Sequence, residues 1–304
     1  MSLFAKASMA LLRVAMRPAM KKASATTAEE AIRKARQYHE KHPFSVPKDR
    51  RAVYTELEAG GYPLLCICPK GGPTDGGRAI LYLHGGLENV WEPEVSIARD
   101  YGRRTGLAVY YAIYPSALEV PFAELMDAIE AAYRLLSGQY GAEHVAVIGG
   151  SMGGLYMMQL IGRLRAHGLA MPGLAIGLSA GGYPERAEDI ALMERYGRRD
   201  PIIPVADMRL LPEEMACLTP GFDAREISPE HGDYHGAAET WLYYAEEVCA
   251  ANAPGYQRAY QRDGSGERLH VHIEPDIMHC YACMPVFRES KRDYAAQIAL
   301  LKSF

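Results

Sequence analysis

Long apolar runs are missing from this sequence of 304 residues, and so is a marked excess of charge of either sign. No run approaches the roughly 20 apolar residues of a membrane-spanning helix, which excludes a protein built on such helices. The formal net charge of -4 gives no reason to expect nucleic acid as a partner. With 49% hydrophobic and 23% charged residues, the chain can bury the core of one large α/β domain or two small ones.

The cysteines lack a metal-binding pattern. A Cys-x-Cys pair far from a Cys-x-x-Cys pair matches no common zinc site, so we expect no metal and no other cofactor. No secretory signal is expected either, because Arg13 and Arg17 interrupt the apolar stretch near the N-terminus. We therefore expect a cytoplasmic protein with reduced thiols. The six cysteines are Cys66, Cys68, Cys217, Cys249, Cys280 and Cys283.

Residues 1–22 contain five basic residues and no acidic residue. One interpretation is an amphipathic helix that makes peripheral contact with a membrane or covers a binding site. The other is a surface helix that packs on its own domain, or a frayed terminus. The composition leaves both interpretations open.

Apolar strand-like segments alternate with helical segments over most of the chain. Strands that are apolar throughout and separated by helices predict a parallel sheet covered on both faces, that is, an α/β fold. Residues 181–235, rich in proline and charge, interrupt the alternation and are interpreted as an insertion over the carboxyl ends of the strands. Strands are expected at 52–58, 62–68, 79–84, 107–113, 144–149, 174–179, 240–244 and 269–274. Helices are expected at 27–41, 93–103, 121–138, 151–168, 186–196, 205–216 and 285–302.

The sharpest chemical signal is a G-x-S-x-G motif centred on Ser151. An apolar strand precedes it and a helix follows it, which is the context that a nucleophilic serine on a tight turn requires. Gly149 and Gly153 supply the small neighbours that this strained turn needs. The alternative, a glycine-rich turn with a serine cap, does not explain the flanking strand and helix.

A second signal is His84-Gly85-Gly86 at the end of the expected strand 79–84. Acyl transfer passes through an oxyanion, which preorganised N–H groups stabilise. In hydrolases with the serine turn, such a loop and the residue after the serine supply these groups. We therefore predict donors at Gly85, Gly86 and Met152, and expect His84 to fix the loop rather than to catalyse.

The catalytic base should be a histidine in a loop after a late strand, and His279 fits because it follows the strand 269–274. The orienting acid should lie between serine and histidine, just past a strand, where Glu246 and Glu247 follow the strand 240–244. Periodicity does not separate the two glutamates. The remaining candidates are expected to be structural (His270 and His272) or at most to line the site (His231 and His235).

Five segments together resemble the hormone-sensitive-lipase-like branch of the α/β-hydrolase fold, the bacterial acetyl-esterase/lipase group. The resemblance covers roughly residues 50–303 and implies an eight-stranded, mostly parallel sheet. It also implies a helical cap formed by residues 1–45 and by an insertion at about 181–225 of the catalytic domain 46–304. The segments are LYLHGG at 81–86, YYAIYP at 110–115, VIGGSMGGLY at 147–156, EISPEHGDYHG at 226–236 and MHCY at 278–281.

The sequence departs from the pattern of that branch at the site. Leu87 follows His-Gly-Gly where a third glycine is usual, and Gly150 removes the acid that usually precedes the serine. Met152 adds bulk beside Ser151. The glutamate pair replaces the usual aspartate: aligning Val248 with the family's aliphatic residue favours Glu246, whereas members that keep only the second acid favour Glu247.

These features predict a serine hydrolase that cleaves short-acyl carboxylic esters, small molecules, through an acyl-enzyme intermediate. An amidase, thioesterase or acyltransferase on the same triad is one alternative. A non-catalytic ligand receptor with the hydrolase fold is another, although receptors of that kind usually lose the serine or the histidine. The oligomeric state is not predicted.

Overall fold

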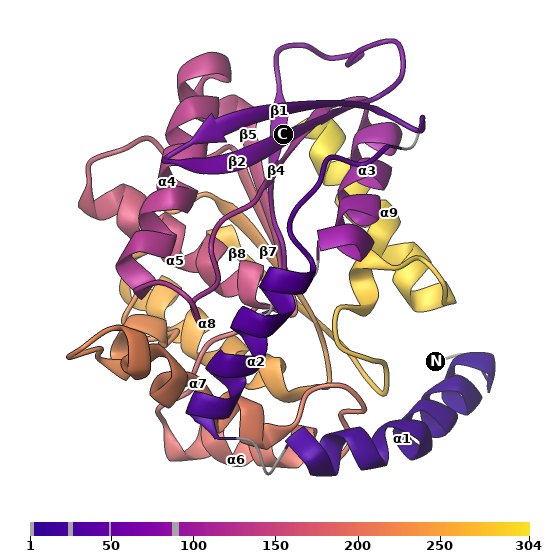
Figure 1. The fold of residues 1–304 in the computed structure, drawn as a ribbon, viewed down its shortest axis with the longest axis vertical. Helices are drawn as coiled ribbons and strands as arrows, with labels where there is room; N and C mark the ends of the chain where they lie inside the picture. The colour runs from indigo at the N-terminus through magenta and orange to yellow at the C-terminus, as the bar shows by residue number, and fades with distance from the viewer. Residues whose placement is uncertain (1–2, 24–26, 49, 87–90) are drawn as a thin grey trace.

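A computed structural model describes residues 3–23, 27–48, 50–86 and 91–304, which form a single eight-stranded sheet with helices on both faces (Figure 1). The strand order is β1-β2-β4-β3-β5-β6-β7-β8. β2 pairs antiparallel with β1 and with β4, and all other neighbours are parallel. The strands are β1 (Val53–Ala59), β2 (Tyr62–Cys68), β3 (Ala79–Leu83), β4 (Ala108–Ala112), β5 (Val145–Gly150), β6 (Leu174–Leu178), β7 (Glu239–Ala245) and β8 (Leu269–Glu274).

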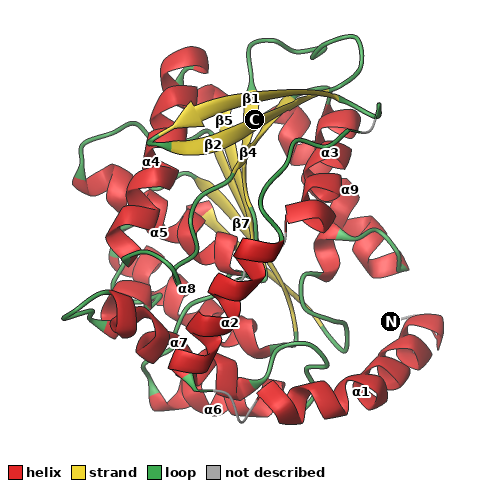
Figure 2. Ribbon diagram, in the orientation of Figure 1, coloured by secondary structure: helices red, strands yellow, loops and turns green. Residues whose placement is uncertain are grey.

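The helices form two layers around the sheet, with α3 and α9 on one face and α4, α5 and α8 on the other (Figures 1 and 2). Both layers are needed because the central strands are apolar on both sides. In β3, Ile80 and Tyr82 belong to one hydrophobic core, and Leu81 and Leu83 belong to the opposite one. The helices are α1 (Leu3–Ala23), α2 (Ala28–Lys41), α3 (Trp91–Thr105), α4 (Phe122–Tyr140), α5 (Met152–Ala166), α6 (Ala187–Gly197), α7 (Val205–Leu218), α8 (Ala253–Arg262) and α9 (Arg288–Ser303).

The predicted α/β fold and its mostly parallel eight-stranded sheet are confirmed. Each expected strand agrees with an observed one to within two residues at both ends. Thr27, at the start of an expected helix, caps α2 by accepting a hydrogen bond from the N–H of Glu30 at 3.3 Å. Leu87 lies outside the described residues.

Four helices outside the two layers gather beyond the carboxyl ends of the parallel strands (Figure 1). α2 packs against α7, where Ile32 and Ala35 form a small apolar cluster that Leu218 joins. α6 packs against residues 248–252, which follow β7. Helices from two distant parts of the chain therefore cover the sheet edge at which the predicted site residues lie.

Helix α1 packs on the body of the protein through one side only. Met9 is buried in the core that includes the α3 and α9 layer, and the Nε of Arg13 donates to the main-chain oxygen of Arg199 at 2.8 Å. Leu11 and Val14 are exposed. Among the described residues, no helix is long and apolar enough to cross a bilayer.

Candidate active site

Ser151 lies on the turn between β5 and α5, with a backbone φ of 52°. Non-glycine residues rarely adopt this conformation, and it persists only where the surroundings enforce it. Those surroundings are tight, because a Cβ on Gly149 would collide with the backbone of Gly153, and a Cβ on Gly153 would collide with the Leu83 carbonyl. The two glycines predicted to flank the nucleophile therefore allow the turn to close.

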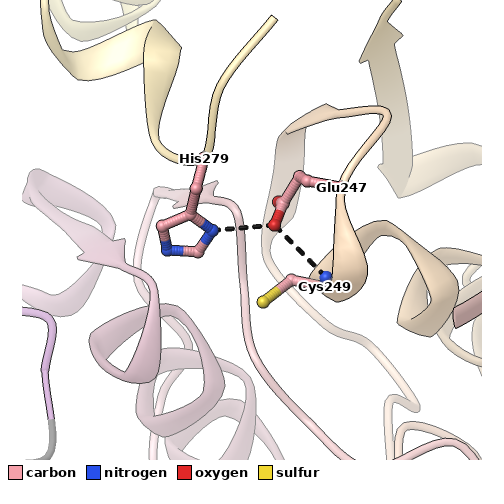
Figure 3. A group of neighbouring side chains, drawn as sticks. All are labelled: Glu247, Cys249 and His279. Carbon is pink, nitrogen blue, oxygen red and sulfur yellow. Dashed lines mark hydrogen bonds and ion pairs between the residues drawn. The ribbon is translucent and has the colours of Figure 1, made fainter. Parts of the chain in front are cut away.

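Ser151, His279 and Glu247 form a continuous chain of hydrogen bonds. The Oγ of Ser151 lies 2.9 Å from Nε2 of His279. On the other side of the ring, Nδ1 of His279 lies 2.7 Å from Oε2 of Glu247, the contact drawn in Figure 3. A neutral imidazole that donates from Nδ1 to the carboxylate accepts at Nε2. The serine hydroxyl therefore faces the one ring nitrogen that can take its proton.

The structure distinguishes the two candidate acids. Glu247 is fully buried, and its Oε2 also accepts from the N–H of Cys249 at 3.2 Å. Glu246 is partly exposed and faces Arg199, with 3.8 Å between its Oε2 and the Nη1 of that arginine. The alignment with Val248 favoured Glu246, but the side chain that turns inward at the end of β7 and contacts His279 is that of Glu247.

The electrostatics at His279 favour its charged form. Burial acts to lower the pKa of His279, whereas Cys280 and Glu247 act to raise it, and the net direction is upward. The hydrogen bond with Cys283 and burial raise the pKa of Cys280 itself. The carboxylate in direct contact with the ring of His279 is that of Glu247, 2.7 Å from Nδ1.

A hydroxyl from a neighbouring strand end holds the histidine loop. The Oγ of Ser179, just past β6, accepts a hydrogen bond from the N–H of Cys280 at 2.9 Å. Ser179 is fully buried, and both residues have positive φ angles, 52° for Ser179 and 54° for Cys280. Sequence reasoning missed Ser179, because nothing in its own segment indicates a partner in a loop 101 residues away.

A carboxylate from the segment between α6 and α7 lies close to Glu247. Asp200 is buried and accepts at Oδ2 from the N–H of Val248 at 3.2 Å. Its Oδ1 accepts from Ile202 and Ile203 at 2.8 and 3.0 Å. Burial, and then the nearby charge of Glu247, raises the pKa of Asp200. Sequence reasoning missed this residue too, because it lies in a segment interpreted only as an insertion.

The loop after β3 lies close to Ser151, since a Cβ on Gly85 would be 3.0 Å from the Cβ of Ser151. His84 is buried, its ring stacks on Tyr114 with 4.1 Å between the ring centres, and its Nδ1 donates to the Gly85 oxygen at 2.9 Å. The hydroxyl of Tyr114 donates to the His84 oxygen. Burial lowers the pKa of His84 to about 4, so the ring is neutral and fixes the loop.

The three predicted oxyanion donors differ in their surroundings. Met152 is the first residue of α5, where a backbone N–H has no acceptor within the helix. Gly86 has a φ of 79°, which glycine adopts readily. The N–H of Gly85 instead donates to the carboxylate of Glu94, at 2.9 Å from Oε1 and 3.0 Å from Oε2. In this structure the N–H groups of Gly86 and Met152 remain candidate oxyanion donors, whereas the N–H of Gly85 is already bonded to Glu94.

A family model described as the alpha/beta hydrolase fold matches residues 80–283, more than half of the chain. The chain belongs to the α/β-hydrolase family. The match runs from β3 to the segment just after His279, so it includes every element that carries the triad. No curated protein matches this α/β-hydrolase in sequence.

Solved structures similar to this α/β-hydrolase share its architecture at low sequence identity. A mutant of the esterase E40 is 21% identical with a TM-score of 0.77, and the match covers 99% of both chains. An esterase from the bacterial hormone-sensitive lipase family is 20% identical, covering 96% of this chain and 97% of the other, with a TM-score of 0.74. EstE5 soaked with p-nitrophenyl butyrate is 22% identical, covering 89% and 90%, with a TM-score of 0.71.

The other candidate histidines lie in separate contacts. His231 and His235 are exposed on the surface of the α/β-hydrolase, paired with Glu185 and Asp233. His270 and His272 lie in β8, as expected for residues with structural roles. None of these four has a hydrogen bond with Ser151, His279 or Glu247 among the described residues.

Three groups of side chains in the described residues have donor atoms close enough to share a metal ion. One includes Glu247, Cys249 and His279, but the first and last are already hydrogen-bonded to each other (Figure 3). Burial raises the pKa of Cys249 well above its ordinary value, which disfavours the thiolate that zinc prefers. In the other two groups an arginine lies among the carboxylates: Arg262 with Asp233, His235 and Asp263, and Arg292 with His272, Glu274 and Asp293.

Proposed function

We propose that this α/β-hydrolase cleaves short-acyl carboxylic esters through an acyl-enzyme intermediate on Ser151. The observation that carries the proposal is the unbroken chain from Ser151 through His279 to the buried Glu247, with distances of 2.9 and 2.7 Å. A serine oxygen beside a neutral, oriented imidazole is the arrangement that acyl transfer requires. The similarity to solved esterases supports the same assignment.

In the first half of the reaction the Oγ of Ser151 attacks the ester carbonyl, and Nε2 of His279 takes the hydroxyl proton. The carbonyl oxygen becomes an oxyanion, which the N–H groups of Gly86 and Met152 stabilise. The start of α5, directly after Ser151, adds the positive end of the helix dipole at this point. Collapse of the intermediate breaks the bond to the alcohol, which leaves with the proton from His279.

In the second half, water attacks the acyl-serine and His279 takes a proton from it. The bond to Ser151 Oγ then breaks, the serine recovers its proton from His279, and the carboxylic acid leaves. Throughout both halves Glu247 keeps the proton on Nδ1 and stabilises the imidazolium. No cofactor or metal takes part in this sequence.

The segments 1–45 and about 181–225 act as the cap over the site, and residues 46–304 form the catalytic domain. The packing of α2 on α7 supports this division, because it joins the two segments over the sheet edge. The contact of Arg13 with Arg199 adds α1 to the same assembly. A cap of this kind limits the room for the acyl chain.

The deciding experiment compares the wild-type protein with Ser151→Ala on p-nitrophenyl butyrate. We expect the wild type to hydrolyse the ester and the variant to show only background. Labelling with a fluorophosphonate probe then separates the alternatives: labelling of Ser151 without turnover of any ester favours an amide, thioester or acyl-acceptor substrate. Failure of both turnover and labelling in the folded wild type would support the non-catalytic receptor and overturn the proposal.

A further inference from the structure

Glu94 is a half-buried carboxylate beside Ser151, outside the hydrogen-bonded chain of Ser151, His279 and Glu247. It lies in the first turn of α3, nine residues after Gly85. Both of its oxygens face the N–H of Gly85, at 2.9 and 3.0 Å, and the hydroxyl of Tyr82 donates to its Oε2 at 3.3 Å. The carboxylate therefore ties the start of α3 to the loop after β3.

The carboxylate also borders the nucleophile. A Cβ placed on Gly85 would lie 3.0 Å from the Cβ of Ser151 and 3.1 Å from Oε1 of Glu94. A Cβ on Gly150, the residue before the serine, would lie 3.8 Å from Oε2 of Glu94. A carboxylate from α3 therefore lies beside position 150, where the family that the sequence resembles usually has an acid.

We propose that Glu94 is a positioning residue of the oxyanion loop: by holding the N–H of Gly85, it orients the next residue of the loop, Gly86, so that its N–H points toward the oxyanion beside the N–H of Met152. This inference rests on the proposed hydrolytic function. The sequence predicted that the N–H of Gly85 would donate to the oxyanion. Here that N–H instead binds Glu94 and fixes the loop, and the N–H of Gly86 is the loop's oxyanion donor. A hydrogen bond to a carboxylate is stronger than one to a neutral acceptor, which suits an anchor in a turn rich in glycine.

The charge of Glu94 is compatible with this role. Burial raises the pKa of Glu94 to about 7, while the bonds from Gly85 and Tyr82 and the positive charge of His279 act in the opposite direction. The other titratable groups that face it are Tyr111 and Tyr114, whose pKa values burial raises, so both stay neutral. Near neutral pH a share of the molecules therefore carries an uncharged Glu94, which still accepts from Gly85 and does not oppose a developing oxyanion.

The test compares Glu94→Gln with Glu94→Ala, and uses Glu58→Gln on the exposed part of β1 as the control. Gln keeps an oxygen that accepts from Gly85 and resembles the protonated acid, so we expect kcat within about fivefold of the wild type. Ala removes the anchor, and we expect kcat to fall by roughly tenfold to a hundredfold with little change in KM, since loss of one oxyanion donor typically costs 10²–10³. The control should match the wild type.

The rate at which a fluorophosphonate labels Ser151 gives a readout that needs no ester turnover. Its phosphoryl oxygen enters the same oxyanion site, so the labelling rate should fall in Glu94→Ala and recover in Glu94→Gln. If the wild type cleaves no ester, the proposed function fails, but this comparison still tests Glu94. If Glu94→Ala does not fold, Glu94→Asp replaces it, because a side chain one methylene shorter should lose the anchor while Gln retains it.

Two results would overturn the inference. An Ala variant with kcat or labelling rate at or above the wild-type value would mean that Glu94 competes with the oxyanion for Gly85. Equal losses in Ala and Gln that follow a drop in melting temperature would mean that Glu94 acts only on stability. Rescue by Gln at an unchanged melting temperature is the expected result.

Discussion

Asp200 accepts a hydrogen bond from the N–H of Val248, the residue directly after Glu247, with 3.2 Å between Oδ2 and N. Since Asp200 belongs to the segment between α6 and α7, this hydrogen bond connects that segment to the residue beside Glu247, the proposed triad acid. Asp200→Asn turns an NH2 group toward Val248 or loses the contacts with Ile202 and Ile203. We expect a several-fold loss in kcat and a lower melting temperature, because a hydrogen bond to a charged group contributes about 1.5–3 kcal/mol. Unchanged kinetics and melting would contradict this link.

Ser151→Ala should abolish ester hydrolysis while the protein stays folded. Loss of a triad member typically lowers kcat by several orders of magnitude. The measurement is turnover of p-nitrophenyl butyrate, with circular dichroism to check the fold. More than about a tenth of the wild-type kcat remaining would remove Ser151 from the role of nucleophile.

Glu247→Gln and Glu246→Gln form a matched pair of neighbours with the same chemical change. Only the first loses the carboxylate that holds the tautomer of His279, so we expect a large loss of kcat, up to about 10⁴ by analogy with the protease triad. The second removes a partly exposed contact with Arg199, and we expect it to cost little. Equal kcat values for the two variants would contradict the assignment of Glu247.

The acidic limb of the kcat/KM profile should lie above pH 6.5. The pKa of His279 is raised, so as the pH falls the ring takes up a proton earlier than an ordinary histidine and can no longer act as base. In Glu247→Gln the loss of the negative charge should move this limb to lower pH. A profile that is flat from about pH 5 to 8 would exclude a histidine base.

Among p-nitrophenyl esters, acetate and butyrate should be the best substrates. Each methylene that finds room adds about 0.8 kcal/mol, or roughly fourfold in kcat/KM, until the pocket is full. Met152 beside the nucleophile and the helices over the sheet edge should set that limit near four carbons. The series from acetate to decanoate measures it, and faster turnover of octanoate than of butyrate would refute the limit.

The strands and the turn that carries Ser151 were predictable from the sequence because their signals are local. The central strands coincide with short apolar runs, whereas β1 is mostly exposed and contains charged residues. The turn at Ser151 is recognised from its own glycines and from the strand and helix beside it. His279 follows from its place after β8. These features depend on residues that are neighbours in the chain, so one sequence is enough to find them.

The contacts that tune the site were not predictable, because they join distant segments. The choice between Glu246 and Glu247 depends on which side chain turns inward at the end of β7. The pattern of the strand does not predict the backbone direction just beyond its last residue. The bond of Ser179 to Cys280 spans 101 residues. The bond of Asp200 to Val248 spans 48 residues, and that of Gly85 to Glu94 depends on how α3 returns to β3.

The position of the site residues at the ends of β3, β5, β7 and β8 has a consequence for folding. Ser151 and His279 are 128 residues apart in the chain, and only the completed ladder from β5 through β6 and β7 to β8 brings them together. Contacts of such long sequence separation form late, because loop-closure entropy opposes them. During refolding, recovery of the proposed ester hydrolysis should therefore lag behind the return of helical circular dichroism, so that ester turnover would report when the last strands have paired.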